Sequence, residues 1–333
     1  MQKSKFLNCV IVACLGIIVA GSTKYVSQKM CYAEADIYDG NYHDIAFDYD
    51  NDNDIFEETD LYTEEREKRN TTSAYIYNNN LGGQKMNNKI NQLKELIQKS
   101  NNIVFFGGAG VSTESNIPDF RSSSGLFSER LNKNFTPEQL VSHTFFVRYP
   151  DEFFKFYKDK LIYQDAKPNN AHKALAKLEE IGKLKAVVTQ NIDGLHQMAG
   201  SKTVYELHGS VHRNYCTKCH KFFDLDSMLA LDGNIPHCDK CGGVVKPDVV
   251  LYEEGLDNST IEGAIRAISS ADLLIIGGTS LVVYPAASFI NYYRGKDMVL
   301  INKSSTGYDN EASLVINDAI GEVLKEAVLD VYK

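Results

Sequence analysis

The sequence IVFFGGAGVS, residues 103–112, decides the fold class of this chain. Its four leading apolar residues predict a short strand that is buried on both faces, and the glycines after it predict a tight turn. A buried strand, a glycine turn and a helix together open a nucleotide-binding βα unit, in which small residues let the backbone approach a phosphate. The third glycine of the G-x-G-x-x-G fingerprint is missing, which disfavours an ordinary dehydrogenase.

Further buried strands are predicted downstream of this stretch. They cover 186–189, 273–276 and 298–301, and each is short, apolar and followed by polar or glycine residues. Helices predicted at 170–182 and 285–294 alternate with them. This alternation predicts an α/β fold with a parallel, doubly wound sheet, whose ligands bind at the carboxyl ends of the strands.

Four of the seven cysteines form two C-x-x-C pairs, Cys216 with Cys219 and Cys238 with Cys241. This spacing predicts that four thiolates converge on one tetrahedral Zn²⁺ ion, and two disulfides are the alternative. A closed four-cysteine site is structural, and here it would stabilise a small lobe at about 210–247 that has little core of its own. The lobe has no strong basic cluster, so no direct nucleic-acid binding is expected.

Polar side chains directly follow the predicted strand at 186–189, a position at which a buried core would favour apolar residues. Gln190, Asn191 and Asp193 are costly to bury there unless they hydrogen-bond a ligand. His208 stands between this cluster and the cysteine pairs, which favours a catalytic role over a structural one. In the loop 117–121, an aromatic ring and an arginine follow a proline and an aspartate, and a capped turn with a surface arginine is the alternative to a nucleotide contact.

The first 85 residues differ from the rest in charge and composition. They carry 14 acidic and eight basic side chains, and the whole chain of 333 residues has a net charge of −9. Residues 1–30 contain an apolar run, 6–21, that predicts a signal-like or membrane-anchoring segment, with a helix packed on the domain as the alternative. Residues 31–85 are acidic and poor in aliphatic side chains, so a disordered linker is expected.

The motifs of residues 86–333, taken in order, resemble the sirtuins, NAD⁺-dependent protein lysine deacylases, and most closely the bacterial type. The motifs are GAGVS at 108–112, PDFR at 118–121, TQNIDGLH at 189–196, HG at 208–209, the two cysteine pairs, KPDVV at 246–250, GTSL at 278–281 and INK at 301–303. The resemblance implies a Rossmann-like catalytic domain over 86–333 with an inserted zinc-ribbon module. It also implies NAD⁺ as co-substrate, one structural Zn²⁺, and acetylated proteins or peptides as partners.

The resemblance also assigns the site residues. NAD⁺ binding falls to Gly108, Ala109, Gly110, Ser112, Thr113, Phe120, Arg121, Gln190, Asn191, Ile192, Asp193, Gly278, Thr279, Ser280 and Asn302. Catalysis falls to Asn191, Asp193 and His208, with His208 as the general base. The acyl-lysine channel falls to Val250, Leu251 and Tyr252, and the metal to Cys216, Cys219, Cys238 and Cys241.

The implied reaction transfers the acetyl group to ADP-ribose and releases nicotinamide and 2′-O-acetyl-ADP-ribose. Protein mono-ADP-ribosyltransfer and a non-catalytic NAD-sensing module are the alternatives. The chain departs from the family pattern at Asn116, which stands where glycine is frequent, and at Glu253-Glu254, which stand where Gly-Glu is frequent. Asparagine accepts a positive φ, whereas Glu253 changes the rim that faces the peptide. Phe127, where tyrosine would favour acidic acyl groups, leaves acetyl as the expected group.

The expected location follows from the chemistry. NAD⁺ is abundant inside cells and four zinc-binding thiolates need a reducing setting, so a cytoplasmic catalytic domain is expected, with 6–21 as a membrane tether. Export and a misassigned start codon are the alternatives.

Overall fold

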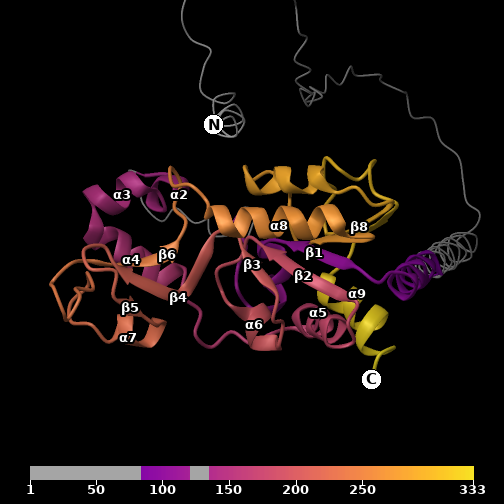
Figure 1. Cartoon of the computed structure of the whole chain (residues 1–333), viewed down its shortest axis with the longest axis horizontal. Coiled ribbons are helices and arrows are strands. Elements are labelled where there is room, and N and C mark those ends of the chain that lie inside the picture. Colours follow the sequence, from indigo (N-terminus) through magenta and orange to yellow (C-terminus); the bar gives the residue numbers. More distant parts are fainter. Residues whose placement is uncertain (1–83, 121–134) are drawn as a thin grey trace, which may run out of the picture. The chain divides into compact units, whose positions relative to one another are not determined.

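The computed structural model describes residues 84–120 and 135–333 (Figure 1). A helix over 84–99 leads into a six-stranded parallel sheet with the strand order β3-β2-β1-β7-β8-β9. The strands are β1 (Ile103–Gly107), β2 (Leu184–Thr189), β3 (Val204–Glu206), β7 (Leu273–Gly277), β8 (Asp297–Ile301) and β9 (Leu314–Ile316). The predicted α/β fold with a parallel sheet is therefore confirmed. The expectation for 1–30 and that for 31–85, up to residue 83, lie outside the described residues, and residues 84 and 85 begin the helix over 84–99.

Helices cover both faces of this sheet, which is why its strands are apolar throughout. Phe105 of β1 packs on one face with α5 (Asn170–Glu180), α9 (Ile320–Leu324) and the π-helical turn η6 (Lys325–Leu329). Val104 and Phe106 point to the other face, toward α8 (Asn258–Ser270) and η5 (Ala286–Tyr292). Figure 1 shows α8 on one side of the strands and α5 and α9 on the other. All five residues of β1 are buried, as a central strand between two helical layers requires.

The first strand of the chain is also central in the sheet, between β2 and β7. The chain builds outward from β1 to β2 and β3 on one side and later to β7, β8 and β9 on the other. The strand order therefore reverses beside β1. A crevice at the carboxyl ends of the strands is expected at such a switch point.

A small lobe is inserted between β3 and β7. Its antiparallel sheet has the order β5-β4-β6, with β4 (Gly209–Cys216), β5 (Phe222–Phe223) and β6 (Val245–Val249). The helix α7 (Leu225–Leu229) follows β5, and the earlier helices α2 (Pro137–Leu140), α3 (His143–Arg148) and α4 (Pro150–Lys160) pack on this sheet. Their shared core is rich in phenylalanine, and it includes Phe153 and Phe154, both fully buried.

Two predicted helices differ in kind from the expectation. After β1 the chain forms two 3₁₀ turns, η2 (Ala109–Val111) and η3 (Thr113–Ser115), because the N–H of Gly110 bonds the carbonyl of Gly278 at 2.8 Å and Asn116 turns the chain with a φ of 63°. The segment 285–294 contains a 3₁₀ helix, η5, because the carbonyl of Pro285 accepts both the N–H and the hydroxyl of Ser288. The edge strands β3 and β9 were not predicted, since three residues carry little periodicity.

Candidate active site

A cleft of about 730 Å³ lies at the carboxyl ends of β1, β2, β7 and β8. The large sheet contributes the loops that directly follow these four strands, and the small lobe contributes His208 and the segment 249–254. The cleft is therefore the crevice that the reversal of strand order predicts.

Close packing of two glycine loops shapes the floor of the cleft. A side-chain carbon at Gly110 would lie 2.8 Å from Gly278 Cα, and one at Gly108 would lie 2.9 Å from Thr279 Cβ. Gly278 also has a φ of 59°, which favours glycine. The glycines thus bring the backbones after β1 and β7 into contact, and the small residues leave room for a phosphate group to approach the main chain.

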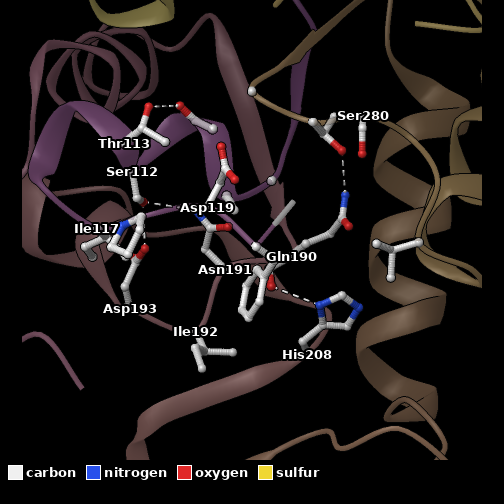
Figure 2. Close-up of a pocket in the computed structure, with 18 of the residues that line it drawn as sticks. Ser112, Thr113, Ile117, Asp119, Gln190, Asn191, Ile192, Asp193, His208 and Ser280 are labelled. Carbon is white, nitrogen blue, oxygen red and sulfur yellow. Dashed lines mark hydrogen bonds between the residues drawn. The ribbon is translucent and has the colours of Figure 1, made fainter. Parts of the chain in front are cut away.

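Three side chains form a polar network beside these loops (Figure 2). Ser112 donates its hydroxyl to Asp193 Oδ2 at 2.6 Å and accepts a bond from Asn191 Nδ2 at 3.0 Å. Asp193 Oδ1 accepts the N–H of Leu195 at 2.9 Å, where α6 (Leu195–Ala199) begins. Ser112 and Asn191 are buried, so these bonds satisfy groups that would otherwise be costly to remove from water. The network orients Asn191 and Asp193 before a ligand enters.

His208 stands at the junction of the two lobes, one residue before β4. Its Nδ1 lies 2.9 Å from the carbonyl oxygen of Gln190 (Figure 2). A carbonyl can only accept, so Nδ1 carries the proton and Nε2 is the basic nitrogen. Burial of the ring lowers the pKa of His208, and the hydrogen bond to Gln190 opposes that effect. The imidazole is therefore neutral at pH 7 and able to accept a proton.

The opposite wall of the cleft is the segment 249–254 after β6, which is joined to the start of α3. Tyr252 donates its N–H to the carbonyl of Val141 and accepts the N–H of His143, both at 3.0 Å. The ring Nδ1 of His143 lies 2.8 Å from Glu254 Oε1. Backbone and side-chain bonds thus hold this wall to a neighbouring helix.

Glu253 also joins the segment 249–254 to α3, and its own backbone conformation is strained. Its φ is 76°, in the left-handed region, and its Oε2 accepts the N–H and the hydroxyl of Thr144 at 2.8 and 2.7 Å. The bond from the Thr144 hydroxyl is the largest effect that lowers the pKa of Glu253. The carboxylate therefore points to α3, and the neighbouring Glu254 pairs with Lys246 at 3.0 Å.

The four predicted zinc ligands come together at the far end of the small sheet. Their sulfur atoms all lie within 4.8 Å of one another, and Cys216–Cys241 and Cys219–Cys238 are 3.4 and 3.7 Å apart. Each cysteine is free, and four sulfurs around one zinc ion at about 2.3 Å would be about 3.8 Å apart. The cluster is therefore consistent with a structural zinc site and not with disulfides.

Comparison with known proteins decides the family. The Sir2 family profile matches residues 108–285, more than half of the chain. The chain belongs to the Sir2 family. A relative from Clostridium perfringens (strain 13 / Type A), an NAD-dependent protein deacetylase, is 72% identical over 244 residues, which cover 73% of this chain and 100% of the relative.

Solved Sir2 structures share the fold as well. One, with a p53 peptide and NAD⁺, matches with a TM-score of 0.63 and 38% identity over 71% of this chain and 96% of that chain. Another, with a deacetylated p53 peptide and 3′-O-acetyl ADP-ribose, matches with a TM-score of 0.67 and 37% identity over 72% of this chain and 98% of that chain.

The Sir2 cleft contains every site residue predicted from the sequence, apart from the cysteines and Arg121. Those that line it are Gly108, Ala109, Gly110, Ser112, Thr113, Phe120, Gln190, Asn191, Ile192, Asp193, His208, Val250, Leu251, Tyr252, Gly278, Thr279, Ser280 and Asn302. The cysteines form their own cluster, and Arg121 and Phe127 lie outside the described residues.

Sequence reasoning missed part of this Sir2 cleft. Lys160 and Tyr163, at and after the end of α4, and Glu114 in η3 also line it. Glu114 accepts the N–H of Gly321 at 2.9 Å and so joins the loop after β1 to α9. No local signal identifies Lys160 and Tyr163, because they stand outside every recognisable motif.

A search of the described residues found no helix both long enough and apolar enough to cross a membrane. The segment 6–21, predicted as an anchor, lies outside them.

Proposed function

We propose that the cleft binds NAD⁺ and an acetylated lysine side chain together and that His208 serves the transfer between them. The chain is an NAD-dependent protein deacetylase that forms O-acetyl-ADP-ribose. The observation that carries the residue-level proposal is the basic Nε2 of His208 in the same cleft as the oriented Asn191–Asp193 pair. A module that only senses NAD⁺ would have no need of a base there.

NAD⁺ lies along the loops at the ends of the four central strands in this proposal. Ala109, Ser112 and Thr113 border its phosphates and ribose, because these small residues line the cleft where the loop follows β1. Thr279, Ser280 and Asn302, at the ends of β7 and β8, hold the adenosine half. Gly108, Gly110 and Gly278 let the two loops approach each other.

The nicotinamide half lies on the small-lobe side of this path. Ile192 and Asp193 bind the carboxamide, and Gln190 and Asn191 position the nicotinamide ribose. Phe120 shields the ring. This assignment is supported by the network with Ser112, since an oriented carboxylate and amide match the donors and acceptors of a carboxamide. Arg121 is assigned to the dinucleotide from the family motif alone.

NAD⁺ supplies an activated ribose carbon, C1′, where the acetyl oxygen of the substrate replaces nicotinamide. His208 Nε2 then accepts the proton of the ribose 2′-hydroxyl, whose oxygen bonds the acetyl carbon. A water molecule that adds to this carbon after that step releases the lysine amine and leaves a hydroxyl at C1′, which gives 2′-O-acetyl-ADP-ribose. Gln190 holds Nδ1 through its carbonyl, so the ring presents the same nitrogen at every turnover. A position for C1′ inside the cleft limits attack by water on this carbon before the acetyl oxygen bonds it.

The acetylated partner enters over the wall formed by Val250, Leu251 and Tyr252. A peptide backbone pairs there as an added strand, while the acetyl-lysine passes inward to His208. Nucleic acid is not a partner in this proposal.

The proposed layout of the chain keeps the boundaries expected from the sequence. Residues 1–30 are a signal-like or anchoring segment, 31–85 a linker and 86–333 the catalytic domain, located in the cytoplasm with 6–21 as a tether. The free cysteine cluster supports a reducing compartment. Cell fractionation with an antibody to the catalytic domain tests this, and recovery from the medium contradicts it.

Mass spectrometry of the full chain with NAD⁺ and a panel of acyl-lysine peptides tests the function. We expect equal amounts of nicotinamide and O-acetyl-ADP-ribose, and at most about a hundredth of these products from His208→Ala in the same time. His220→Ala, on the cysteine-bearing lobe but outside the cleft, is the matched control. ADP-ribose attached to protein would indicate a transferase instead. Bound NAD⁺ without turnover would indicate a sensing module.

A further inference from the structure

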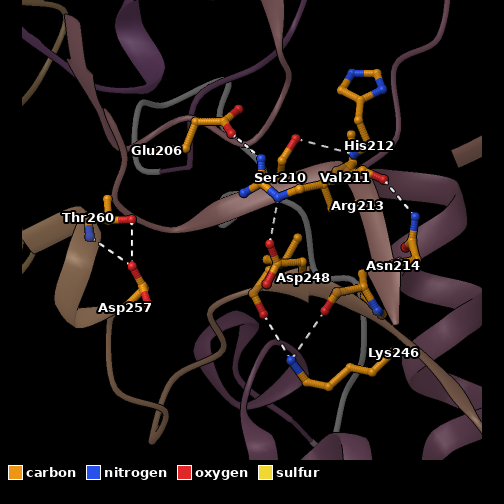
Figure 3. Close-up of polar contacts among 12 residues, drawn as sticks. Glu206, Ser210, Val211, His212, Arg213, Asn214, Lys246, Asp248, Asp257 and Thr260 are labelled. Atoms are coloured by element: carbon orange, nitrogen blue, oxygen red, sulfur yellow. Dashed lines mark hydrogen bonds and ion pairs between the residues drawn. The ribbon is translucent and has the colours of Figure 1, made fainter. Parts of the chain in front are cut away.

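Strand β4 changes partner in its middle. Gly209 and Ser210 pair with β6, and so do Asn214 and the two residues after it. The β6 partners of Ser210 and Asn214 are consecutive residues, so 211–213 have no partner on β6 and form a bulge. Two hydrogen bonds within β4 stabilise the bulge (Figure 3). His212 N–H donates to Ser210 Oγ at 3.3 Å, and Asn214 Nδ2 donates to the carbonyl of Val211 at 3.1 Å. Bulges of this kind re-aim side chains and often lie next to active sites.

The bulge residues bond the large domain instead. Val211 donates its N–H to the carbonyl of Ile192, and His212 Nε2 lies next to the carbonyl of Asp193, both at 3.0 Å. Since a carbonyl only accepts, His212 Nε2 carries the proton in this bond. Two successive residues of β4 thus hold two successive carbonyls of the loop after β2.

His212 also covers Gly194, the next residue of that loop. A side-chain carbon at Gly194 would lie 2.6 Å from His212 Cδ2, so the ring rests directly on the glycine backbone. Gly194 has a φ of 72°. The contact and the hydrogen bond act on the same short turn, which leads from Asp193 into α6.

Arg213 joins the two sheets on the other side of the bulge (Figure 3). Its Nη1 bonds Glu206 Oε2 of β3 at 2.5 Å, and its Nε bonds Asp248 Oδ2 of β6 at 2.8 Å. The side chain of Glu206 is only 7% exposed, so this carboxylate depends on the arginine for its charge partner. The arginine therefore keeps the bulge in place between the sheets.

We infer that His212 is a positioning residue for the nicotinamide end of the cleft. It holds the main chain of Asp193 from the small lobe, while Ser112 holds the side chain of Asp193 from the large one. The inference rests on the proposed function, in which Ile192 and Asp193 bind the carboxamide. The acyl-lysine wall at 250–252 follows β6 and is joined to α2 and α3 through Tyr252, whereas His212 is on β4 and bonds the loop after β2, so nicotinamide and peptide should respond differently to its loss.

Steady-state kinetics of the full chain test the inference. For His212→Ala we expect the KM for NAD⁺ and the inhibition constant of nicotinamide both to rise roughly threefold to tenfold, with the KM for an acetyl-lysine peptide unchanged. His212→Gln should restore part of the loss, because its side-chain amide can donate to the same carbonyl. His212 is exposed, so the fold survives the change.

Tyr215→Ala is the control for general damage to β4, since Tyr215 is exposed on the same strand and contacts Phe222 of the small sheet. Tyr215→Ala should leave the KM for NAD⁺, the inhibition constant of nicotinamide and the KM for the peptide near those of the unmodified chain. Calorimetric binding of nicotinamide to His212→Ala gives a readout independent of turnover. Unchanged nicotinamide and NAD⁺ constants in His212→Ala, or an equal rise in the peptide KM, would overturn the inference. An unmodified chain that releases no nicotinamide would instead overturn the proposed function.

Discussion

The buried ring of His208 determines how the rate should depend on pH. The neutral imidazole is the active form, and burial lowers its pKa below the ordinary 6.5. Activity should therefore persist to lower pH than a free imidazole allows, and kcat/KM should fall only below about pH 6.5. The pH profile of kcat/KM measures this, and an acidic limb centred above 6.5 would contradict it.

Replacement of His208 by alanine should lower kcat by roughly 10²–10⁴-fold, the usual range for a general base. NAD⁺ affinity, measured by calorimetry, should change little, because the glycine loops and the Ser112–Asn191–Asp193 network stay intact. A variant that retains most of its deacetylase activity would exclude His208 as the base.

Glu253 keeps a left-handed conformation that glycine would adopt without strain. Glu253→Gly should preserve the fold but release the wall at 250–252 from Thr144, which raises the peptide KM roughly threefold to tenfold at unchanged KM for NAD⁺. Thr144→Val removes only the hydroxyl bond and should give a smaller rise. If peptide kinetics are the same in all three proteins, the wall does not depend on this connection.

His172 and His196 form a buried pair whose rings are 4.7 Å apart, below the catalytic loop. Burial lowers the pKa of His172 to about 4, and the charge of Asp193 opposes this effect. In the unfolded chain His172 binds a proton near pH 6.5, whereas in the folded chain it does so only near pH 4. The contribution of His172 to the free energy of unfolding is therefore complete above pH 6.5 and decreases as the pH falls toward 4. Urea unfolding at a series of pH values should show this slope, and His172→Gln should flatten it.

At the scale of elements, the small sheet depends on its metal. Strand β5 has two residues, and the four-cysteine cluster joins Cys216 at the end of β4 to Cys219, Cys238 and Cys241 in the segments that connect the strands. Chelation of zinc, or Cys238→Ser, should unfold this lobe and abolish deacetylation, while most of the far-ultraviolet signal of the large domain remains. Elemental analysis should find one zinc per chain. Cys31→Ser, which changes a cysteine of the N-terminal 83 residues that belongs to neither C-x-x-C pair, is the control and should keep both zinc and activity.

Sequence patterns predicted elements best where the local signal was strong. The strands β1, β7 and β8 were predicted within a residue or two, because four apolar residues in a row require burial on both faces. The turns after β1 were predicted as an α-helix, and the contact of Gly110 with Gly278 explains the 3₁₀ geometry. That contact joins residues from two different strand ends, which no window of sequence can show.

At the scale of the molecule, the catalytic domain should be independent of the first 83 residues. The Clostridium perfringens relative matches over its full length to 73% of this chain, so a complete protein of this family needs no such extension. A protein of residues 84–333 should therefore show the melting temperature and kcat/KM of the full chain. A loss of either would mean that the extension contributes to the fold or the cleft.

The sequence by itself predicted the fold class, the four-cysteine cluster and the polar residues after β2, while the other cleft residues followed from the resemblance to the sirtuins. It could do so because each signal is local: an apolar run ending in glycine, two C-x-x-C pairs, and polar residues directly after a buried strand. In a parallel sheet those strand ends must meet at one edge, so local motifs become one site.

Only the tertiary structure decided how that site is held. The bond from Glu114 to Gly321 spans 207 residues, and those from His212 to Asp193 and from Glu253 to Thr144 join segments that share no pattern. Neither the left-handed Glu253 nor the bulge of β4 has a local signature, because each is maintained by partners elsewhere in the fold. Contacts of this kind depend on the packing of the two lobes, and packing is a property of the whole folded chain.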